Sequence, residues 1–454
     1  MKKNINMFED KILSTLIKLS VPIMGTAFIA IAYSLVDIIW IGRLSTASVA
    51  ATGTSGVLIW FAQSLMLIPK VGMSVRASQN YGKGDYEKSK VSISTGFYFA
   101  IFISLSLTSI YVFFGREIIS FFKLSEEVSK MAYDYLRVIS YGFVFAFISE
   151  IFSGAYNSFG DSISPFRLNS IGLILNMILD PILIFGLFNF PKLGIIGAAL
   201  ASILSQMVVT ILFFIIVISE KGITFHGMNF KKFSLGEMKI ISKLGLPSFL
   251  QSGVQSIVAM FLNKFMALYG KTPVAVYSVG AMIESVAWMT TDGFQAALSA
   301  FTGQNFGAKH YDRIKGAFKV GILLVSSLGV LVALVFVLFG KEIFSIFIPN
   351  DPKAIEFGAI YLSILSISEP FMNIEIASTG IYNGISQTRT PGIIGVLGNI
   401  LRIPISLLLM PIYGVFGVWI AVSLSSIIKG ITSSLILHHR LKNDKFYLNG
   451  STIH

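Results

Sequence analysis

The sequence predicts an all-α integral membrane protein with twelve transmembrane helices in two pseudo-symmetric six-helix lobes. Two observations carry this prediction, the apolar composition and an internal repeat. Of the 454 residues, 54% are hydrophobic and only 13% are charged, whereas a soluble domain carries about 25% charged residues. A water-soluble globule could not cover this much apolar surface. The 39 Phe and 16 Tyr residues exclude a disordered chain.

The helices follow from apolar stretches, because a transmembrane helix needs about 20 mostly apolar residues. Polar residues break the stretches around Asp180 and Glu375, which leaves the count open by one. The first stretch contains Asp37 and no small-residue cleavage site, so we expect it to be retained as a helix rather than removed as a signal peptide. The twelve stretches begin near Ser14, Ser48, Ser92, Ala132, Leu168, Ile195, Leu244, Val274, Val320, Glu356, Gly392 and Gly414.

The basic residues indicate the orientation, because membrane proteins concentrate Lys and Arg in cytoplasmic loops. With the N-terminus inside, the inner tails and loops hold most of the loop Lys and Arg, including Lys83, Lys88 and Lys90. We therefore expect a multi-pass protein of the cell membrane (plasma or inner membrane) with both termini cytoplasmic. The net charge of +12 is explained by this topology, so no nucleic acid partner is expected.

Several chemistries are excluded by what the sequence lacks. There is no Cys, and the five His are scattered or terminal, so thiolate chemistry and paired-His metal sites are absent. No GxxxxGK[ST] loop occurs. The spans hold no nucleophile–base constellation. We predict that the chain is not an enzyme and needs no cofactor other than a coupling ion.

The internal repeat divides the chain into two halves. ASQNYGKGDYEKSK at Ala77–Lys90 recurs as TGQNFGAKHYDRIK at Thr302–Lys315. Four further pairs keep the same order: LSVP and LGLP, ending at Pro22 and Pro247; GAYNSFGDSISP and GIYNGISQTRTP; LNMILDP and GNILRIP, ending at Pro181 and Pro404; GIIGAALA and GVFGVWIA, at Gly194–Ala201 and Gly414–Ala421.

Six helices in each half bring the second copy back in the same orientation, so we expect an axis along the membrane normal. Parallel repeats of this kind occur in secondary transporters, with the substrate site near the midplane. We predict an N-lobe at 1–220, a cytoplasmic linker at 221–243, a C-lobe at 244–438 and a cytoplasmic tail at 439–454.

Ionisable residues at membrane depth are costly and are therefore functional candidates. Asp37 follows Tyr33 by four residues, Asp180 follows Asn176 by four, and Ser202 follows Ala198 by four. This spacing places each pair on one helix face. Carboxylate, amide and hydroxyl oxygens suit a hard cation, and two nearby carboxylates equally favour proton exchange. The alternative is that Asp37 and Asp180 only brace helix packing.

Taken together, these residues and motifs resemble the multidrug and toxic compound extrusion (MATE) family over the whole length. The resemblance is carried by SLVDIIWIG at Ser34–Gly42, by QNYGKGDYEK and QNFGAKHYDR, and by LNMILDP. It implies two six-helix lobes that form a V-shaped central cleft, with export driven by a gradient of H⁺ or Na⁺.

The resemblance also implies a cation-coupling site in the N-lobe. Family members use an Asp on helix 1, an Asn and an Asp four apart on helix 5, and a Thr on helix 6. Asp37, Asn176 and Asp180 match directly and Ser202 replaces the Thr, so these four would also hold Na⁺. Tyr33 lies beside them, and Pro22 would be the proline at which helix 1 bends in some relatives.

The C-lobe lacks this acidic pair, because Leu262 and Ile403 stand where Asp37 and Asp180 would be expected. Glu284, Trp288 and Asp292 instead share one face of the eighth helix. Glu284 and Trp288 would bind a cationic drug by charge and ring face, or Glu284 would pair with Lys264 or Arg402; both readings stay open. Relatives place an acidic residue on helix 10, which makes Glu375 a further candidate for substrate binding or secondary coupling.

We therefore predict a secondary active multidrug efflux transporter that exports organic, cationic and amphipathic compounds in exchange for H⁺ or Na⁺ by alternating access. The alternative is a flippase for a lipid-linked saccharide of the same superfamily. Acidic residues outnumber basic ones at mid-span, which favours export of cations. The expected partners are small-molecule drugs or toxins and the lipid bilayer, and we expect a monomer.

Overall fold

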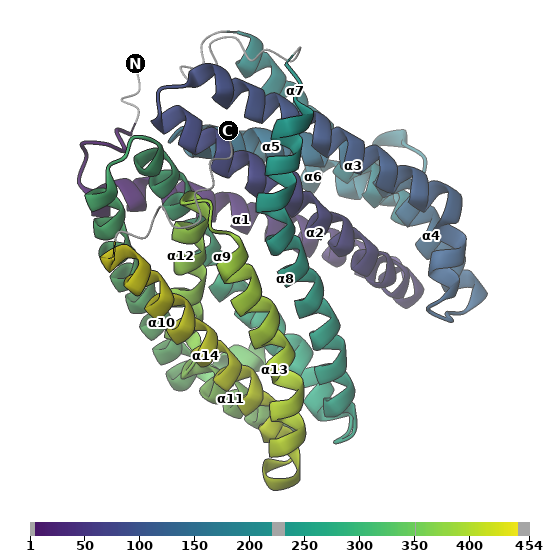
Figure 1. Cartoon of the computed structure of the whole chain (residues 1–454). Coiled ribbons are helices and arrows are strands. Elements are labelled where there is room, and N and C mark those ends of the chain that lie inside the picture. Colours follow the sequence, from purple (N-terminus) through teal and green to yellow (C-terminus); the bar gives the residue numbers. More distant parts are fainter. Residues whose placement is uncertain (1–4, 220–231, 350, 444–454) are drawn as a thin grey trace. The chain divides into compact units, whose positions relative to one another are not determined.

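The computed structural model describes residues 5–219, 232–349 and 351–443, and every regular element in these ranges is a helix (Figure 1). This confirms the prediction of an all-α chain. The helices are α1 (Ile12–Gly42), α2 (Thr46–Gly82), α3 (Tyr86–Ser120), α4 (Glu126–Ser140), α5 (Phe143–Ser158), α6 (Ile163–Phe185), the short 3₁₀ helix η1 (Leu187–Asn189), α7 (Ile195–Ile218), α8 (Leu235–Ala267), α9 (Lys271–Gly307), α10 (Tyr311–Phe347), α11 (Pro352–Ser366), α12 (Glu369–Gly384), α13 (Arg389–Tyr413) and α14 (Val415–Lys442).

Two of the expected spans are bent pairs of helices. α4 and α5 meet at 48°, and α11 and α12 meet at 51°. Among the described residues, nine helices are long and apolar enough to cross a membrane, or up to 11 spans if each bent pair counts as one. α9 is not among them, because Glu284 and Asp292 interrupt its apolar sequence. The chain is a multi-pass membrane protein.

Side chains and glycines mark the helix ends. Four residues that precede helices accept a hydrogen bond from the backbone N–H three positions on, which satisfies a group that the helix leaves free. These N-caps are Ser45, Asp85, Ser125 and Asp351. At Asp85 this bond, donated by Lys88, lowers the pKa of the carboxyl group. Gly186 ends α6 with a φ of 76°, a conformation that favours glycine.

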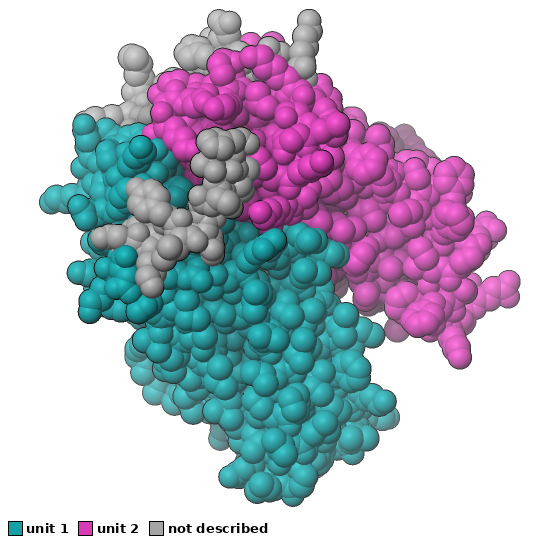
Figure 2. All heavy atoms as spheres, in the orientation of Figure 1, with its two compact units in different colours: residues 1, 3–24, 246–454 teal, residues 2, 25–245 magenta. Residues whose placement is uncertain are grey.

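The described residues form two compact units (Figure 2). Unit 2 runs from Gly25 to Gly245, and unit 1 combines the residues up to Met24 with those from Leu246 onward. α1 and α8 therefore each contribute to both units. Pro22 and Pro247, which are equivalent in the repeat, lie within two residues of these divisions.

Each unit has its own apolar core. One core of unit 2 lies between α2, α3, α5 and α7, with Phe152 and Phe213 fully buried, and a second includes Ile41, Tyr135 and Ile184. One core of unit 1 includes Leu16 and Leu19 of α1, and a second surrounds the buried Trp419 of α14. The predicted linker lies outside the described residues up to residue 231, and from Leu235 it is part of α8. The predicted tail begins inside α14, and residues 444–454 lie outside the described part.

Candidate cation-coupling site

α6 supplies the centre of the candidate site. Asn176 and Asp180 lie one turn apart on its buried face, and both are 0% exposed. Pro181 follows inside the same helix. Because proline lacks an N–H group, the carbonyl oxygen of Met177 loses its helical hydrogen bond. The buried face of α6 therefore presents carboxylate and amide oxygens.

Hydrogen bonds join four of the predicted residues within unit 2. The amide nitrogen of Asn176 donates to Asp180 Oδ1 at 3.2 Å, to Asp37 Oδ1 at 3.5 Å and to Ser202 Oγ at 3.5 Å. Ser202 Oγ in turn donates to Asp37 Oδ2 at 3.3 Å. The structure thus brings Asp37 of α1, Asn176 and Asp180 of α6, and Ser202 of α7 into one cluster.

The cluster has more acceptors than donors. Asn176 Oδ1, Asp180 Oδ2 and the hydroxyl of Tyr33 are buried without a hydrogen-bond partner among the described residues. The two carboxyl groups also interact electrostatically. Buried polar atoms normally have partners, and two close carboxylates repel. The atoms of the cluster that could act as ligands are all oxygens, which fits a proton or a small hard cation.

Packing around the cluster leaves room for a phenol ring. A Cβ atom at Gly172, one turn before Asn176, would lie 2.5 Å from the Tyr33 hydroxyl and 2.5 Å from a methyl group of Val209. Glycine at this position therefore lets Tyr33 reach the cluster. Tyr135 of α4, 6% exposed, also interacts electrostatically with both carboxylates. Tyr135 could not be predicted as part of the site, because nothing in its local sequence relates α4 to α6.

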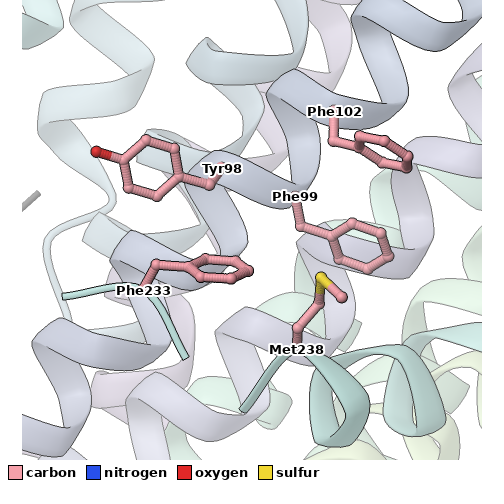
Figure 3. Close-up of a pocket in the computed structure, with 5 residues that line it drawn as sticks. All are labelled: Tyr98, Phe99, Phe102, Phe233 and Met238. Carbon is pink, nitrogen blue, oxygen red and sulfur yellow. The ribbon is translucent and has the colours of Figure 1, made fainter. Parts of the chain in front are cut away.

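A small cavity approaches the cluster from the side of Ser202. Its volume is about 140 Å³, and its lining includes Ser202 and the amide side chains of Gln63 and Gln206. A larger pocket of about 420 Å³ lies elsewhere in unit 2, between α3 and the start of α8, with walls made of Tyr98, Phe99, Phe102, Phe233 and Met238 (Figure 3). None of the described wall residues of that pocket is acidic or basic, and in Figure 3 the Tyr98 hydroxyl points away from the other four side chains.

The other predicted residues lie in unit 1, outside this cluster. Pro22 is inside α1, three residues before Gly25, where unit 2 begins. Glu284 of α9 accepts a hydrogen bond of 2.5 Å from the Tyr361 hydroxyl of α11. Arg402 interacts electrostatically with this carboxylate, so both readings of Glu284, drug binding and pairing with a basic residue, stay predictions. On the same helix, Trp288 is half-buried and Asp292 is exposed.

Glu375 of α12 has a basic partner that was not among the predicted residues. Its carboxylate forms an ion pair of 2.9 Å with the ammonium group of Lys429 in α14, and both side chains are almost fully buried. The signal was present in the sequence, because Lys429 stands in the middle of an apolar stretch. Glu375 and Glu284 therefore have different partners: Glu375 pairs with Lys429, and Glu284 is hydrogen-bonded to Tyr361.

Comparisons with known proteins agree with this architecture. The family model MatE matches residues 22–182 and 247–408, one match in each half of the repeat. A probable multidrug resistance protein NorM of Thermotoga maritima is 26% identical over 439 residues, which cover 96% of this chain and 92% of that protein. A protein of Shewanella oneidensis named FAD transporter is 23% identical over 433 residues, 95% of each chain.

Solved structures show the same fold. A MOP superfamily transporter from Pyrococcus furiosus, described as having a binding pocket of reverse polarity, has a TM-score of 0.90 at 20% identity and covers 98% of this chain and 100% of its own. An outward-facing multidrug resistance MATE family transporter has a TM-score of 0.88 at 22% identity. The match covers 98% of this chain and 99% of that transporter. The two family matches span most of the sequence, and the chain therefore belongs to the MatE family.

Proposed function

We propose that this transporter is a secondary active exporter of organic, cationic and amphipathic compounds, which it exchanges for H⁺ or Na⁺ by alternating access. The observation that carries the proposal is the cluster of Asp37, Asn176, Asp180 and Ser202 in unit 2, with its unpartnered oxygens. The names of two relatives, the probable multidrug resistance protein NorM of Thermotoga maritima and the multidrug export protein MepA of Staphylococcus haemolyticus, support export of small molecules.

The cluster suits coupling because its charge is not balanced by the described protein groups around it. With both carboxylates ionised, the polar atoms of Asn176 and Ser202 supply the hydrogen bonds but no positive charge. A bound proton or Na⁺ relieves the repulsion, so arrangements of α1, α6 and α7 that differ in carboxylate spacing differ in cation affinity. Coupled exchange requires only that substrate and cation favour different arrangements.

α1 is the element that would carry this change beyond the cluster. Asp37 and Tyr33 lie in the part of α1 that belongs to unit 2, whereas Pro22 lies in the part that packs in unit 1. Proline removes one helical hydrogen bond and permits a bend. Pro22 is therefore the proposed conformational residue. Cation binding at Asp37 would be coupled to a bend of α1 at Pro22.

In unit 1 the acidic residue best placed to attract an organic cation is Glu284. Its carboxylate is hydrogen-bonded to Tyr361, and Tyr277 lies against the ring of Tyr361 at a centroid separation of 6.4 Å. A carboxylate among aromatic rings attracts a cationic, amphipathic molecule. Trp288 and Asp292 also remain proposed substrate residues. Their support is weaker, because it is only that they lie on α9 together with Glu284.

The proposal is tested in proteoliposomes by imposing a pH gradient and a Na⁺ gradient separately and measuring efflux of a fluorescent organic cation. We expect efflux with one of the two gradients, and its loss in a folded double variant, Asp37→Asn with Asp180→Asn. Glu150→Gln is the matched control, because Glu150 pairs with Lys70 at 2.7 Å at a half-exposed position of unit 2. Normal gradient-driven efflux in the double variant would place the coupling site elsewhere.

A further inference from the structure

Arg402 of α13 is a basic residue of unit 1 that has no direct partner of opposite charge among the described residues. Its side chain is half-buried, and its Nε and Nη2 atoms donate long hydrogen bonds of 3.4 Å to Ser425 and Ser426 of α14. The Nη1 atom has no acceptor among the described residues. A charged side chain within a membrane is costly, and the hydrogen-bonding capacity of this one is only partly used.

A second polar side chain on the same helix face also lacks partners. Asn399 lies one turn before Arg402, and residues three apart are neighbours on a helix surface. The Asn399 side chain is 1% exposed, and neither its amide nitrogen nor its amide oxygen has a hydrogen-bond partner among the described residues. Buried polar atoms normally have partners. Arg402 and Asn399 thus offer N–H donors that no described group of the protein accepts.

The neighbouring basic residue of unit 1 is already neutralised. Lys429 of α14 interacts electrostatically with Arg402, but its ammonium group forms the ion pair of 2.9 Å with Glu375. Lys429 and Glu375 therefore balance each other. The positive charge of Arg402 is not needed to compensate either of them.

Glu284 of α9 carries the opposite charge at a short distance from Arg402 without touching it. The two groups interact electrostatically, but the hydrogen bond that Glu284 accepts comes from the Tyr361 hydroxyl, and no ion pair joins it to Arg402 in the described structure. Tyr277 interacts with both charged groups, and its ring lies against that of Tyr361. An acidic and a basic side chain therefore lie near each other, beside aromatic rings.

We propose that Arg402 is a specificity-determining residue for transport, which binds a carboxylate group of the exported compound while Glu284 binds its cationic group. The preferred substrate is then a zwitterion, because a simple cation leaves Arg402 unpaired and a simple anion leaves Glu284 unpaired. Arginine suits this role, since its planar guanidinium group can bind both oxygens of a carboxylate. The inference rests on the proposed function, in which Glu284 attracts the cationic group.

Two other roles of Arg402 lead to different expectations. If Arg402 only joins α13 to α14 through the two serines, its removal lowers stability and changes the affinity for all ligands to the same extent. If it acts only through its positive charge, a lysine at the same position replaces it fully. The affinity for a carboxylate ligand relative to its ester, measured in both variants, therefore isolates direct binding.

The experiment measures equilibrium binding of three fluorescent dyes of one scaffold to the purified full-length protein in nanodiscs, by fluorescence anisotropy. A rhodamine with a free carboxylate carries both charges, its methyl ester keeps only the cation, and fluorescein carries only anionic groups. We expect the wild type to bind the zwitterionic rhodamine about ten- to hundredfold more tightly than the ester, as hydrogen bonds between charged groups allow. Fluorescein should bind most weakly.

The variants assign this preference to Arg402. Arg402→Gln should bind the free acid and the ester equally, and Arg402→Lys, which keeps the charge but not the planar donors, should retain only a small part of the preference. Glu284→Gln should weaken binding of both rhodamines and keep the preference for the carboxylate. Arg389→Gln is the matched control, because Arg389 is an exposed arginine at the start of the same helix, and it should change nothing.

The outcomes distinguish this inference from the proposed function. A wild type that exports the ester but binds it as tightly as the free acid overturns the role of Arg402 and leaves the proposed function standing. Full preference for the carboxylate in Arg402→Gln or in Arg402→Lys also overturns that role. A wild type that neither binds nor exports either rhodamine overturns both. If Arg402→Gln does not fold, the wild type and Arg402→Lys decide the question.

Discussion

Asp180→Asn removes one of two carboxyl groups that share a single amide donor, and the structure sets the size of the effect. Asp37 Oδ1 and Asp180 Oδ1 both lie within hydrogen-bonding reach of Asn176 Nδ2, at 3.5 and 3.2 Å, so these oxygens are at most about 7 Å apart. Two unit charges at about 7 Å repel by about 2 kcal/mol at an effective dielectric constant of about 20. The variant should therefore be more stable than the wild type by about 2 kcal/mol when both carboxylates are ionised.

The sign of this effect depends on pH and on cations. At low pH a proton already relieves the repulsion in the wild type, so the advantage of Asp180→Asn should be small and should grow as pH rises. Added Na⁺ should shrink the advantage at high pH if the cluster binds Na⁺, because the bound ion stabilises only the folded wild type. Without affinity for Na⁺, the advantage should respond to pH alone.

Thermal unfolding followed by Trp fluorescence in detergent, with choline as the only added cation, measures the difference from pH 5 to pH 9. Glu150→Gln is the control, because a half-exposed ion pair contributes about 0–1 kcal/mol and has no repelling neighbour to relieve. An Asp180→Asn variant that is less stable than the wild type at every pH would show that the carboxylate braces packing, contrary to this reasoning.

Three further predictions concern unit 2. Glu237→Ala should lower the free energy of unfolding by about 3 kcal/mol, measured by thermal unfolding, because Arg76 bonds this carboxylate through two nitrogens at 2.8 and 3.0 Å; an unchanged melting temperature would contradict this. Gly172→Ala should cost about 1–3 kcal/mol and weaken cation binding, whereas Gly53→Ala, with open space around its Cβ, should change neither. A Lys83→Cys variant should react with an impermeant maleimide only from the cytoplasmic side, and labelling of intact cells from outside would refute the predicted topology.

Much of the helical architecture could be predicted from the sequence, because burial in a bilayer demands long apolar stretches. The helix starts were placed too late where polar turns extend a helix beyond the apolar region. α3 begins at Tyr86 rather than near Ser92, and α8 at Leu235 rather than near Leu244. The division of the described residues at Met24 and Gly245 has no local signal, because it depends on which distant helices each part of α1 and α8 contacts.

The candidate site was partly predictable, because the membrane also makes buried polar residues conspicuous in the sequence. Asp37, Asn176 and Asp180 are recognisable because carboxylates and amides are costly in a membrane, and the i,i+4 spacing places two of them on one face. Tyr135 was not predictable, because an aromatic residue is ordinary in an apolar helix. The pairing of Glu375 with Lys429 could be recognised only in the three-dimensional structure, because α12 and α14 are separated by the whole of α13 in the sequence.

The sharing of α1 has a consequence for how the protein is made. Met7, Leu16 and Leu19 are at most 1% exposed, in a core with Phe294 and other residues of the second half.

The N-terminal stretch is also fixed by polar contacts, since Asn305 and Arg313 donate to the carbonyl of Met7. This stretch is therefore packed against partners that are synthesised nearly three hundred residues after it. Until α9 and α10 have been inserted, this part of α1 has no core to join, and a second half produced alone would lack one of its own walls. This part of α1 must therefore remain unpacked until the second half has been synthesised and inserted. Folding of the second half is then completed together with α1, not independently of it.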